Sequence, residues 1–176
     1  GKFERVGNHL SVGGVYPYSI EEKEFNFITD LIVKNNLKRG YELATGTGIS
    51  ALAAGLGFKE TGGKLVSLDS YIENHTGKLS YENTKEVYQD SECYETALYL
   101  KDKYNVPIEL ELGWSPDNVS DILEKHFEDK LDYVFIDGQH YRESILSDIN
   151  ILKDFMGKGF MLFHDVSRKE VKNSVN

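Results

Sequence analysis

The chain has 176 residues, of which 40% are hydrophobic and 28% charged, a balance typical of one globular domain with its own core. The formal net charge is −9 and the basic residues are scattered, so nucleic acid is not expected as a partner. The single cysteine, Cys93, excludes an internal disulfide and a cysteine-based zinc site, and no apolar run is long enough to cross a bilayer. We expect a single cytoplasmic domain over residues 1–176, without a membrane partner.

Residues 1–57 are expected to form an arm, two helices and a strand. Residues 1–19 lack clear periodicity and are expected to form an N-terminal arm. Apolar residues recur at helical spacing from Ile20, and Tyr41–Thr45 follows as the first strand. The next helical pattern is expected to stop at Gly55 and Gly57, because glycine is typical of helix ends.

The rest of the chain alternates between strands and helices. Four further strands are predicted at Lys64–Asp69, Pro107–Leu112, Leu131–Asp137 and Gly159–Asp165. Ser115 before Pro116 is a favourable helix start, with serine as the cap and proline at the first helical position. The polar, poorly periodic residues 70–90 are expected to form a lid. Alternating strands and helices predict a three-layer α/β/α sandwich with a Rossmann-like, mostly parallel sheet.

A polar or glycine-bearing cluster follows each of these strands. In parallel sheets, ligands bind beyond the carboxyl ends of the strands, where such clusters meet. One aspartate after a strand is more often a turn or cap residue, but five clusters at one edge favour a ligand site. The clusters are Glu42 with residues 46–48, Asp69, Trp114-Ser115, residues 137–140 and His164-Asp165.

The run of residues 41–50 predicts a strand, a glycine turn and a helix. Gly46 and Gly48 lack a Cβ, so the backbone can turn sharply and a ligand can approach it. The following helix directs unpaired N–H groups at the same place. Asp69 lies about 20 residues further on, where a carboxylate accepts hydrogen bonds from ribose hydroxyls, although it could instead cap a loop or helix. Together these features predict a cofactor that contains a nucleoside.

The glycine turn alone leaves the cofactor open. Residues 46–51 satisfy the loose G-x-G-x-x-G/A pattern, which would make the chain an NAD-dependent oxidoreductase with Asp69 on the ribose. Against this, Glu42 would crowd a pyrophosphate but could bond a cationic or amino-acid ligand. Residues 137–140 and 164–165 also lack an evident hydride-transfer set.

Residues 42–50 resemble the first motif of class I S-adenosylmethionine-dependent methyltransferases. Residues 135–141, the helix carrying Asp148 and residues 158–165 are similar to the later half of a subgroup that contains small-molecule and sugar O-methyltransferases. The resemblance spans roughly residues 22–166. It implies S-adenosylmethionine as cofactor, a small molecule or sugar as acceptor, and transfer of a methyl group to a hydroxyl.

The resemblance also implies roles for individual residues. From its position just beyond a strand end and its unperturbed pKa of about 6.5, His140 is expected to remove the acceptor's proton, although it could instead be a loop histidine bonded to backbone. Asp137 is the second expected catalytic residue. Related enzymes place a divalent metal such as Mg²⁺ at positions matching Asp137, His164 and Asp165, which could instead order the cofactor loop and cap the strand. The cofactor residues so implied are Glu42, Ala44, Thr45, Gly46, Gly48, Ser50, Asp69, Ser70, Trp114, Ser115 and Asp137.

Trp114 and Ser115 would border the adenine, with a core tryptophan and a helix-capping serine as the alternative. The chain departs from the family at Ala44, where a further glycine is usual, and it stops soon after the fifth predicted strand, before the family's last two strands. A non-catalytic module that binds S-adenosylmethionine is therefore an alternative. The missing substrate wall would come from the arm, residues 70–90 or a second subunit, so a homodimer is one expectation; the sequence does not identify the acceptor.

Overall fold

The computed structural model of the chain describes residues 3–6, 9–12, 20–70, 92–137 and 142–164. In chain order its elements are β1 (Phe3–Val6), β2 (His9–Val12), α1 (Glu22–Lys34), β3 (Arg39–Leu43), α2 (Ile49–Thr61), β4 (Lys64–Asp69), α4 (Glu92–Tyr104), β5 (Ile108–Leu112), α5 (Val119–His126), β6 (Leu131–Ile136), α6 (Arg142–Phe155) and β7 (Met156–Phe163). Every predicted strand is present, β4 at its predicted bounds and the other four with shifted ends. The antiparallel pair β1–β2, within the expected arm, was not predicted.

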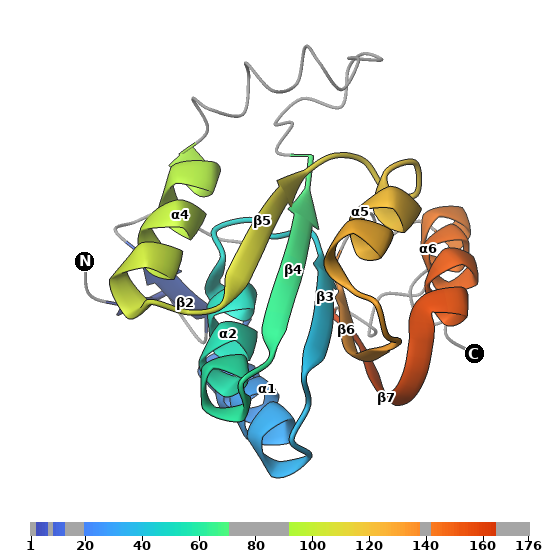
Figure 1. Ribbon diagram of the computed structural model, residues 1–176. Coiled ribbons are helices and arrows are strands. Elements are labelled where there is room, and N and C mark those ends of the chain that lie inside the picture. The colour runs from blue at the N-terminus through green and yellow to red at the C-terminus, as the bar shows by residue number, and fades with distance from the viewer. Residues whose placement is uncertain (1–2, 7–8, 13–19, 71–91, 138–141, 165–176) are drawn as a thin grey trace.

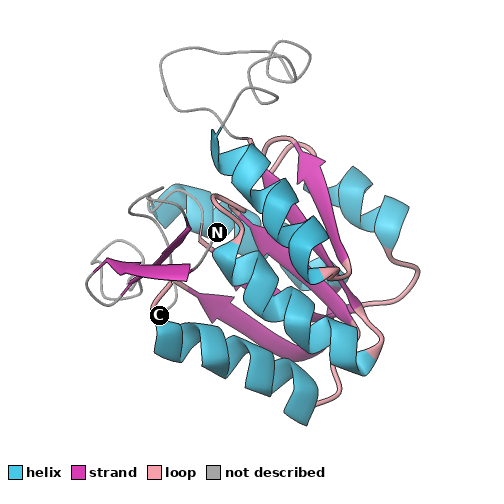
Figure 2. Ribbon diagram, turned by 90° about the vertical axis from the view of Figure 1, so that its left-hand side faces the viewer, coloured by secondary structure: helices cyan, strands magenta, loops and turns pink. Residues whose placement is uncertain are grey.

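The main sheet has five parallel strands in the order β5-β4-β3-β6-β7. Helices α1, α2 and α4 cover one face, and α5 and α6 cover the other (Figure 1). Figure 2 looks onto the first of these faces. The chain starts the sheet at β3, builds outward to β5 and then returns to place β6 on the other side of β3. The predicted α/β/α fold class is confirmed, and the strand order reverses between β3 and β6, where ligands bind in such sheets.

The prediction that Gly55 and Gly57 end a helix was wrong. Helix α2 continues through both to Thr61, and Gly62, which has a φ of 79°, caps its end. A Cβ on Gly55 would lie 2.9 Å from the side chain of Ile108, and one on Gly57 would lie 2.8 Å from Cβ of Ile32. The two glycines allow α2 to pack closely on β5 and α1, and this packing outweighs their low helix propensity.

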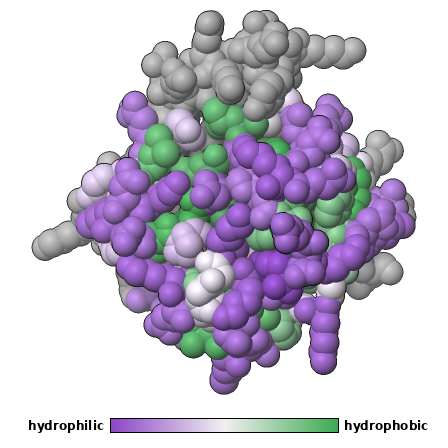
Figure 3. All heavy atoms as spheres, in the orientation of Figure 1, coloured by the Kyte–Doolittle hydropathy of each residue, from purple (hydrophilic) through white to green (hydrophobic). Residues whose placement is uncertain are grey.

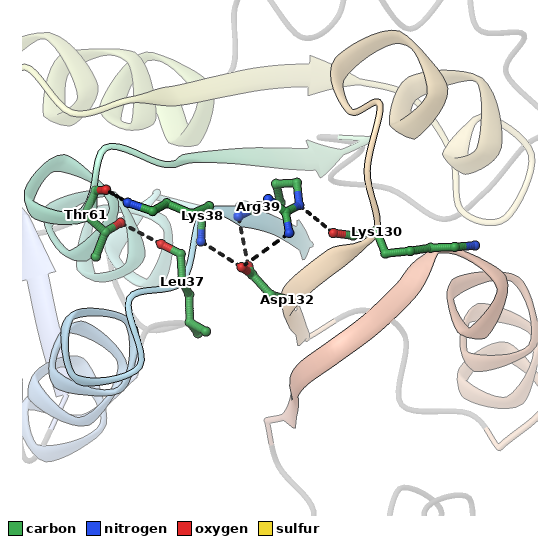
Figure 4. A network of polar contacts seen from close by, with 6 residues as sticks. All are labelled: Leu37, Lys38, Arg39, Thr61, Lys130 and Asp132. Carbon is green, nitrogen blue, oxygen red and sulfur yellow. Dashed lines mark hydrogen bonds and ion pairs between the residues drawn. The ribbon is translucent and has the colours of Figure 1, made fainter.

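A polar network joins the amino-terminal ends of β3 and β6 (Figure 4). The carboxylate of Asp132 accepts hydrogen bonds from the backbone N–H groups of Lys38 and Arg39, each at 2.8 Å. The Arg39 side chain donates to the carbonyl of Lys130 at 2.6 Å, and the Lys38 ammonium donates to the carbonyl of Thr61. These contacts fix the end of the sheet opposite the predicted site.

The surface seen in Figure 3 is mainly hydrophilic, in keeping with the 28% of charged residues. Of the helices that the structure describes, none combines the length and the apolar character needed to span a membrane.

Candidate functional site

A pocket of about 130 Å³ lies at the carboxyl end of the sheet, beside the point where strand order reverses. Ligand pockets usually have volumes of about 300–1,000 Å³, so these walls form only one end of a site. The pocket is lined by Ile20, Ala44, Thr45, Gly46, Thr47, Ile49, Ser50, Asp69 and Asp137.

Gly46 and Gly48, the two glycines of the turn, are needed for different structural reasons. Both adopt left-handed conformations, with φ of 53° at Gly46 and 84° at Gly48. A Cβ on Gly46 would have no atom within 4 Å, whereas one on Gly48 would lie 2.9 Å from Cα of Ala97 in α4. Gly46 therefore keeps the pocket wall open, while Gly48 allows α4 to pack against the turn.

Ala44 also has a left-handed backbone, with a φ of 73°. For an L-amino acid with a Cβ this conformation costs about 1–2 kcal/mol, whereas glycine adopts it readily. The backbone N–H of Ala44 donates to the carbonyl of Leu68 at 2.8 Å, which extends the pairing of β3 with β4. A glycine-like conformation at the pocket is thus held by an alanine.

The glycine turn is tied to β4 by two side-chain contacts. The N–H of Gly46 donates to Oδ2 of Asp69 at 2.8 Å, and the hydroxyls of Thr45 and Ser67 share a buried hydrogen bond of 2.6 Å. Asp69 thus caps the turn, which was the alternative role. A carboxylate has about four acceptor sites, so this bond is compatible with a ribose contact.

Glu42 is fully buried in β3 and reaches the pocket wall through Ser50. The Ser50 hydroxyl donates to Oε1 of Glu42 at 2.8 Å, while Oε2 has no hydrogen-bond partner among the described residues. Burial raises the pKa of Glu42 well above its usual value; the charges of Asp137 and Asp69 add to this, and the Ser50 bond opposes it. A cation beside this carboxyl group would favour its ionised form.

Asp137 and His164 meet at the ends of β6 and β7. Nδ1 of His164 lies 3.0 Å from Oδ1 of Asp137, and its Nε2 lies 3.9 Å from Oε2 of Glu24 in α1. His140 and Asp165, the predicted base and third metal ligand, lie outside the described residues. Within the described part of the chain, no three His, Cys, Asp or Glu side chains are placed to hold a metal ion. The two described donors bond each other and include an imidazole, so they do not fit Mg²⁺, which prefers oxygen ligands.

The prediction that Ser115 caps a helix beginning at Pro116 was wrong. The Ser115–Pro116 peptide is cis, and α5 begins at Val119 with Asn118 in the capping position. The hydroxyl of Ser115 instead donates to Oδ1 of Asp148 in α6. A tertiary partner has therefore replaced the local capping bond that the sequence suggested.

The loop of residues 113–118 lies next to β4 but outside the pocket lining. The N–H of Gly113 donates to the carbonyl of Asp69 at 3.2 Å, so the loop is attached to a predicted cofactor residue. The loop also closes on itself, because the N–H of Trp114 donates to Oδ1 of Asn118 at 2.9 Å and its carbonyl accepts from the N–H of Asn118 at 2.9 Å.

The pocket brings together Ala44, Thr45, Gly46, Ser50, Asp69 and Asp137 from the predicted set. The predicted residues that do not line it are Glu42, Gly48, Ser70, Trp114 and Ser115. Sequence reasoning missed Ile20, Thr47 and Ile49 as wall residues. Thr47 and Ile49 lie within the predicted motif, but Ile20 lies on no motif, and only its burial against the turn identifies it.

The sequence profile of a family described as a methyltransferase domain matches residues 42–166. A comparison with proteins of curated function found no match. The chain shares 17% identity and a TM-score of 0.62 with the methyltransferase PaMTH1 of Podospora anserina, bound to S-adenosylhomocysteine, over 84% of this chain and 54% of that one.

Two further solved structures are similar. The O-methyltransferase of Bacillus cereus in complex with S-adenosylhomocysteine has 17% identity and a TM-score of 0.56, over 81% of this chain and 56% of that one. The O-methyltransferase TomG of Streptomyces achromogenes, involved in tomaymycin synthesis and solved with S-adenosylmethionine, has 15% identity and a TM-score of 0.58, over 79% and 53%. These likenesses show the fold, and the chain spans a little more than half the length of each structure.

Proposed function

Because the chain belongs to the family of methyltransferase domains, we propose that it transfers a methyl group from S-adenosylmethionine to a hydroxyl of a small molecule or sugar. The observation that carries the proposal is one pocket in which the glycine turn, Asp69 and Asp137 meet beside the buried Glu42. Structures with the same fold contain S-adenosylmethionine or its product, and two of them are O-methyltransferases.

The pocket residues suit a cationic adenosyl cofactor. When bound, S-adenosylmethionine supplies an electrophilic methyl group on a positively charged sulfur. Asp69 would accept hydrogen bonds from the ribose hydroxyls while still bonding Gly46. Glu42 and Asp137 would place negative charge beside the cationic end, and Gly46, Ala44 and Thr45 would let it approach the backbone. Trp114 and Ser115 would border the adenine.

The acceptor must be held in line with the methyl group and must lose its hydroxyl proton. We assign the removal of this proton to His140, which follows Asp137 by three residues in the sequence. His164 would orient Asp137 through their hydrogen bond of 3.0 Å. Residues 70–90 are proposed as the lid that encloses the acceptor.

A divalent metal at Asp137, His164 and Asp165 stays a prediction from the resemblance. The two donors that the structure describes do not fit Mg²⁺, so no step of the mechanism is routed through a metal. Dialysis against EDTA tests this prediction: activity that is lost and then restored by Mg²⁺ would support the metal, and unchanged methyl transfer would contradict it.

Two alternatives remain for the same pocket. A non-catalytic module that binds S-adenosylmethionine is the first alternative, since Ala44 takes a left-handed backbone conformation at a position where the family usually has glycine. An NAD-dependent oxidoreductase is disfavoured by the family match. A homodimer and a cytoplasmic location are also proposals, and sedimentation at several protein concentrations would test the first.

Isothermal titration with S-adenosylhomocysteine and, separately, with NAD tests the cofactor. We expect the homocysteine compound to bind and NAD not to bind; the reverse would overturn the proposal. A transfer assay with labelled S-adenosylmethionine and a panel of hydroxylated aromatics and sugars then tests catalysis. Binding without transfer to any acceptor, together with unchanged binding in His140→Ala, would favour the non-catalytic module.

A further inference from the structure

A buried aspartate in α6, Asp148, lies outside the pocket and has no role in the mechanism above. It is only 5% exposed, and its carboxyl group accepts a hydrogen bond from the hydroxyl of Ser115. Burial raises the pKa of Asp148, and the Ser115 bond opposes that rise. A carboxyl group placed this deeply is costly unless its partner is well positioned.

The contact joins two segments that are far apart in the chain, since Ser115 and Asp148 are separated by 33 residues. Ser115 belongs to the loop of residues 113–118, whose other end bonds the carbonyl of Asp69 through Gly113. Within the loop, Asn118 bonds both backbone groups of Trp114. The loop is closed by these internal hydrogen bonds. Besides its covalent connections to β5 and α5, it is attached to Asp69 of β4 and to Asp148 of α6.

We infer that Asp148 is a positioning residue for the cofactor: through Ser115 it holds the 113–118 loop against the adenosyl end of the site. The inference rests on the proposed function, because it takes this loop as the border of the adenine. The bond also uses the only hydrogen of the Ser115 hydroxyl, so that hydroxyl can offer the ligand only acceptor lone pairs.

The experiment compares four single variants and one double variant for affinity to S-adenosylhomocysteine by titration calorimetry. Asp148→Ala removes the acceptor and should weaken binding about tenfold, the order expected for one lost hydrogen bond to a charged group. Asp148→Asn keeps an acceptor oxygen and should retain affinity within about threefold. Asp154→Ala, an exposed aspartate on the same helix, is the matched control and should leave affinity unchanged.

Ser115→Ala closes a double-mutant cycle with Asp148→Ala. If Asp148 acts through Ser115, the double variant should bind no more weakly than Ser115→Ala alone. A merely structural role would instead leave the affinity of each folded variant near the wild type, or make the two losses additive. Either result would overturn the inference.

Trp114 is the only tryptophan in the chain, so its fluorescence reports on this loop without a ligand. Acrylamide quenching of Trp114 should increase in Asp148→Ala and Ser115→Ala, and not in Asp154→Ala. Equal quenching in all variants would overturn the inference, and Ser115→Ala decides the matter if Asp148→Ala does not fold. Failure of the wild type to bind S-adenosylhomocysteine would contradict the proposed function instead, while the quenching would still test whether Asp148 holds the loop.

Discussion

At the amino-terminal end of the sheet both oxygens of a buried carboxylate accept hydrogen bonds. At the carboxyl end, one oxygen of another buried carboxyl group has no hydrogen-bond partner among the described residues. Asp132 accepts two backbone N–H groups and lies 4.0 Å from the Arg39 guanidinium (Figure 4). Glu42 is more deeply buried, yet only one of its oxygens is bonded within the described structure. The same strand, β3, runs between the two arrangements.

We interpret the amino-terminal end as the part of the sheet that contributes to stability, and the carboxyl end as the part that binds a ligand. A buried polar atom without a partner costs about 1–3 kcal/mol, which a stable fold tolerates where a ligand compensates for it. The pocket end also contains the left-handed Ala44, a second local cost. We therefore expect substitutions at the amino-terminal end to affect stability, and those at the carboxyl end to affect mainly ligand affinity.

The largest expected effect is at Asp132. Asp132→Ala leaves two backbone N–H groups unpaired and should lower the free energy of unfolding by about 3 kcal/mol. Urea denaturation measures this, with the exposed Asp129→Ala as control. At low temperature the folded variant should bind S-adenosylhomocysteine with nearly wild-type affinity. Equal stability of the two variants would show that the network contributes little.

The second effect is on affinity alone. Asp69→Asn retains an oxygen that can accept from Gly46, so stability should change by less than about 0.5 kcal/mol. If Asp69 binds the ribose as proposed, loss of its negative charge should weaken S-adenosylhomocysteine binding about tenfold, as measured by calorimetry. Asp102→Asn, on the exposed face of α4, is the control. An unchanged dissociation constant would mean that Asp69 only caps the turn.

Ala44 should show a smaller change of opposite sign. Ala44→Gly removes the cost of a left-handed alanine, partly offset by a more flexible unfolded chain, and should raise the free energy of unfolding by about 0.5–1 kcal/mol. Ala51→Gly, in the helical conformation of α2, should lower it. Thermal denaturation of both variants compares the two signs. Destabilisation by Ala44→Gly would show that the methyl group packs usefully.

A further prediction is a difference in the pH dependence of stability. Because the folded pKa of Glu42 is raised above the usual value of 4.5, its contribution to stability is fully present below that value and is lost as pH rises through the folded pKa. Glu42→Gln does not titrate, so its stability relative to the wild type should increase with pH. Melting curves across this range measure the trend, with exposed Glu60→Gln as control. Parallel curves for the wild type and Glu42→Gln would contradict it.

The sequence determined the element types, the parallel sheet and much of the pocket. Short apolar runs bounded by turn or polar residues identified every strand of the main sheet, because burial on both faces of a parallel sheet favours such runs. The strand, glycine turn and helix around Gly46 were equally readable, since a left-handed turn at a helix start needs glycine. Asp69 and Asp137 followed, because the ends of parallel strands meet at one edge.

Only the tertiary structure decided how those residues are used. It placed Gly55 and Gly57 inside a helix, since close packing against other elements outweighed local propensity. It brought Ser115 into hydrogen-bonding contact with Asp148, 33 residues further along the chain, a pairing that no local pattern encodes. It also left one oxygen of Glu42 without a partner in the described structure. Local spacing specifies which elements form, whereas the partner of a buried polar group depends on which distant segments the packed fold brings within hydrogen-bonding distance.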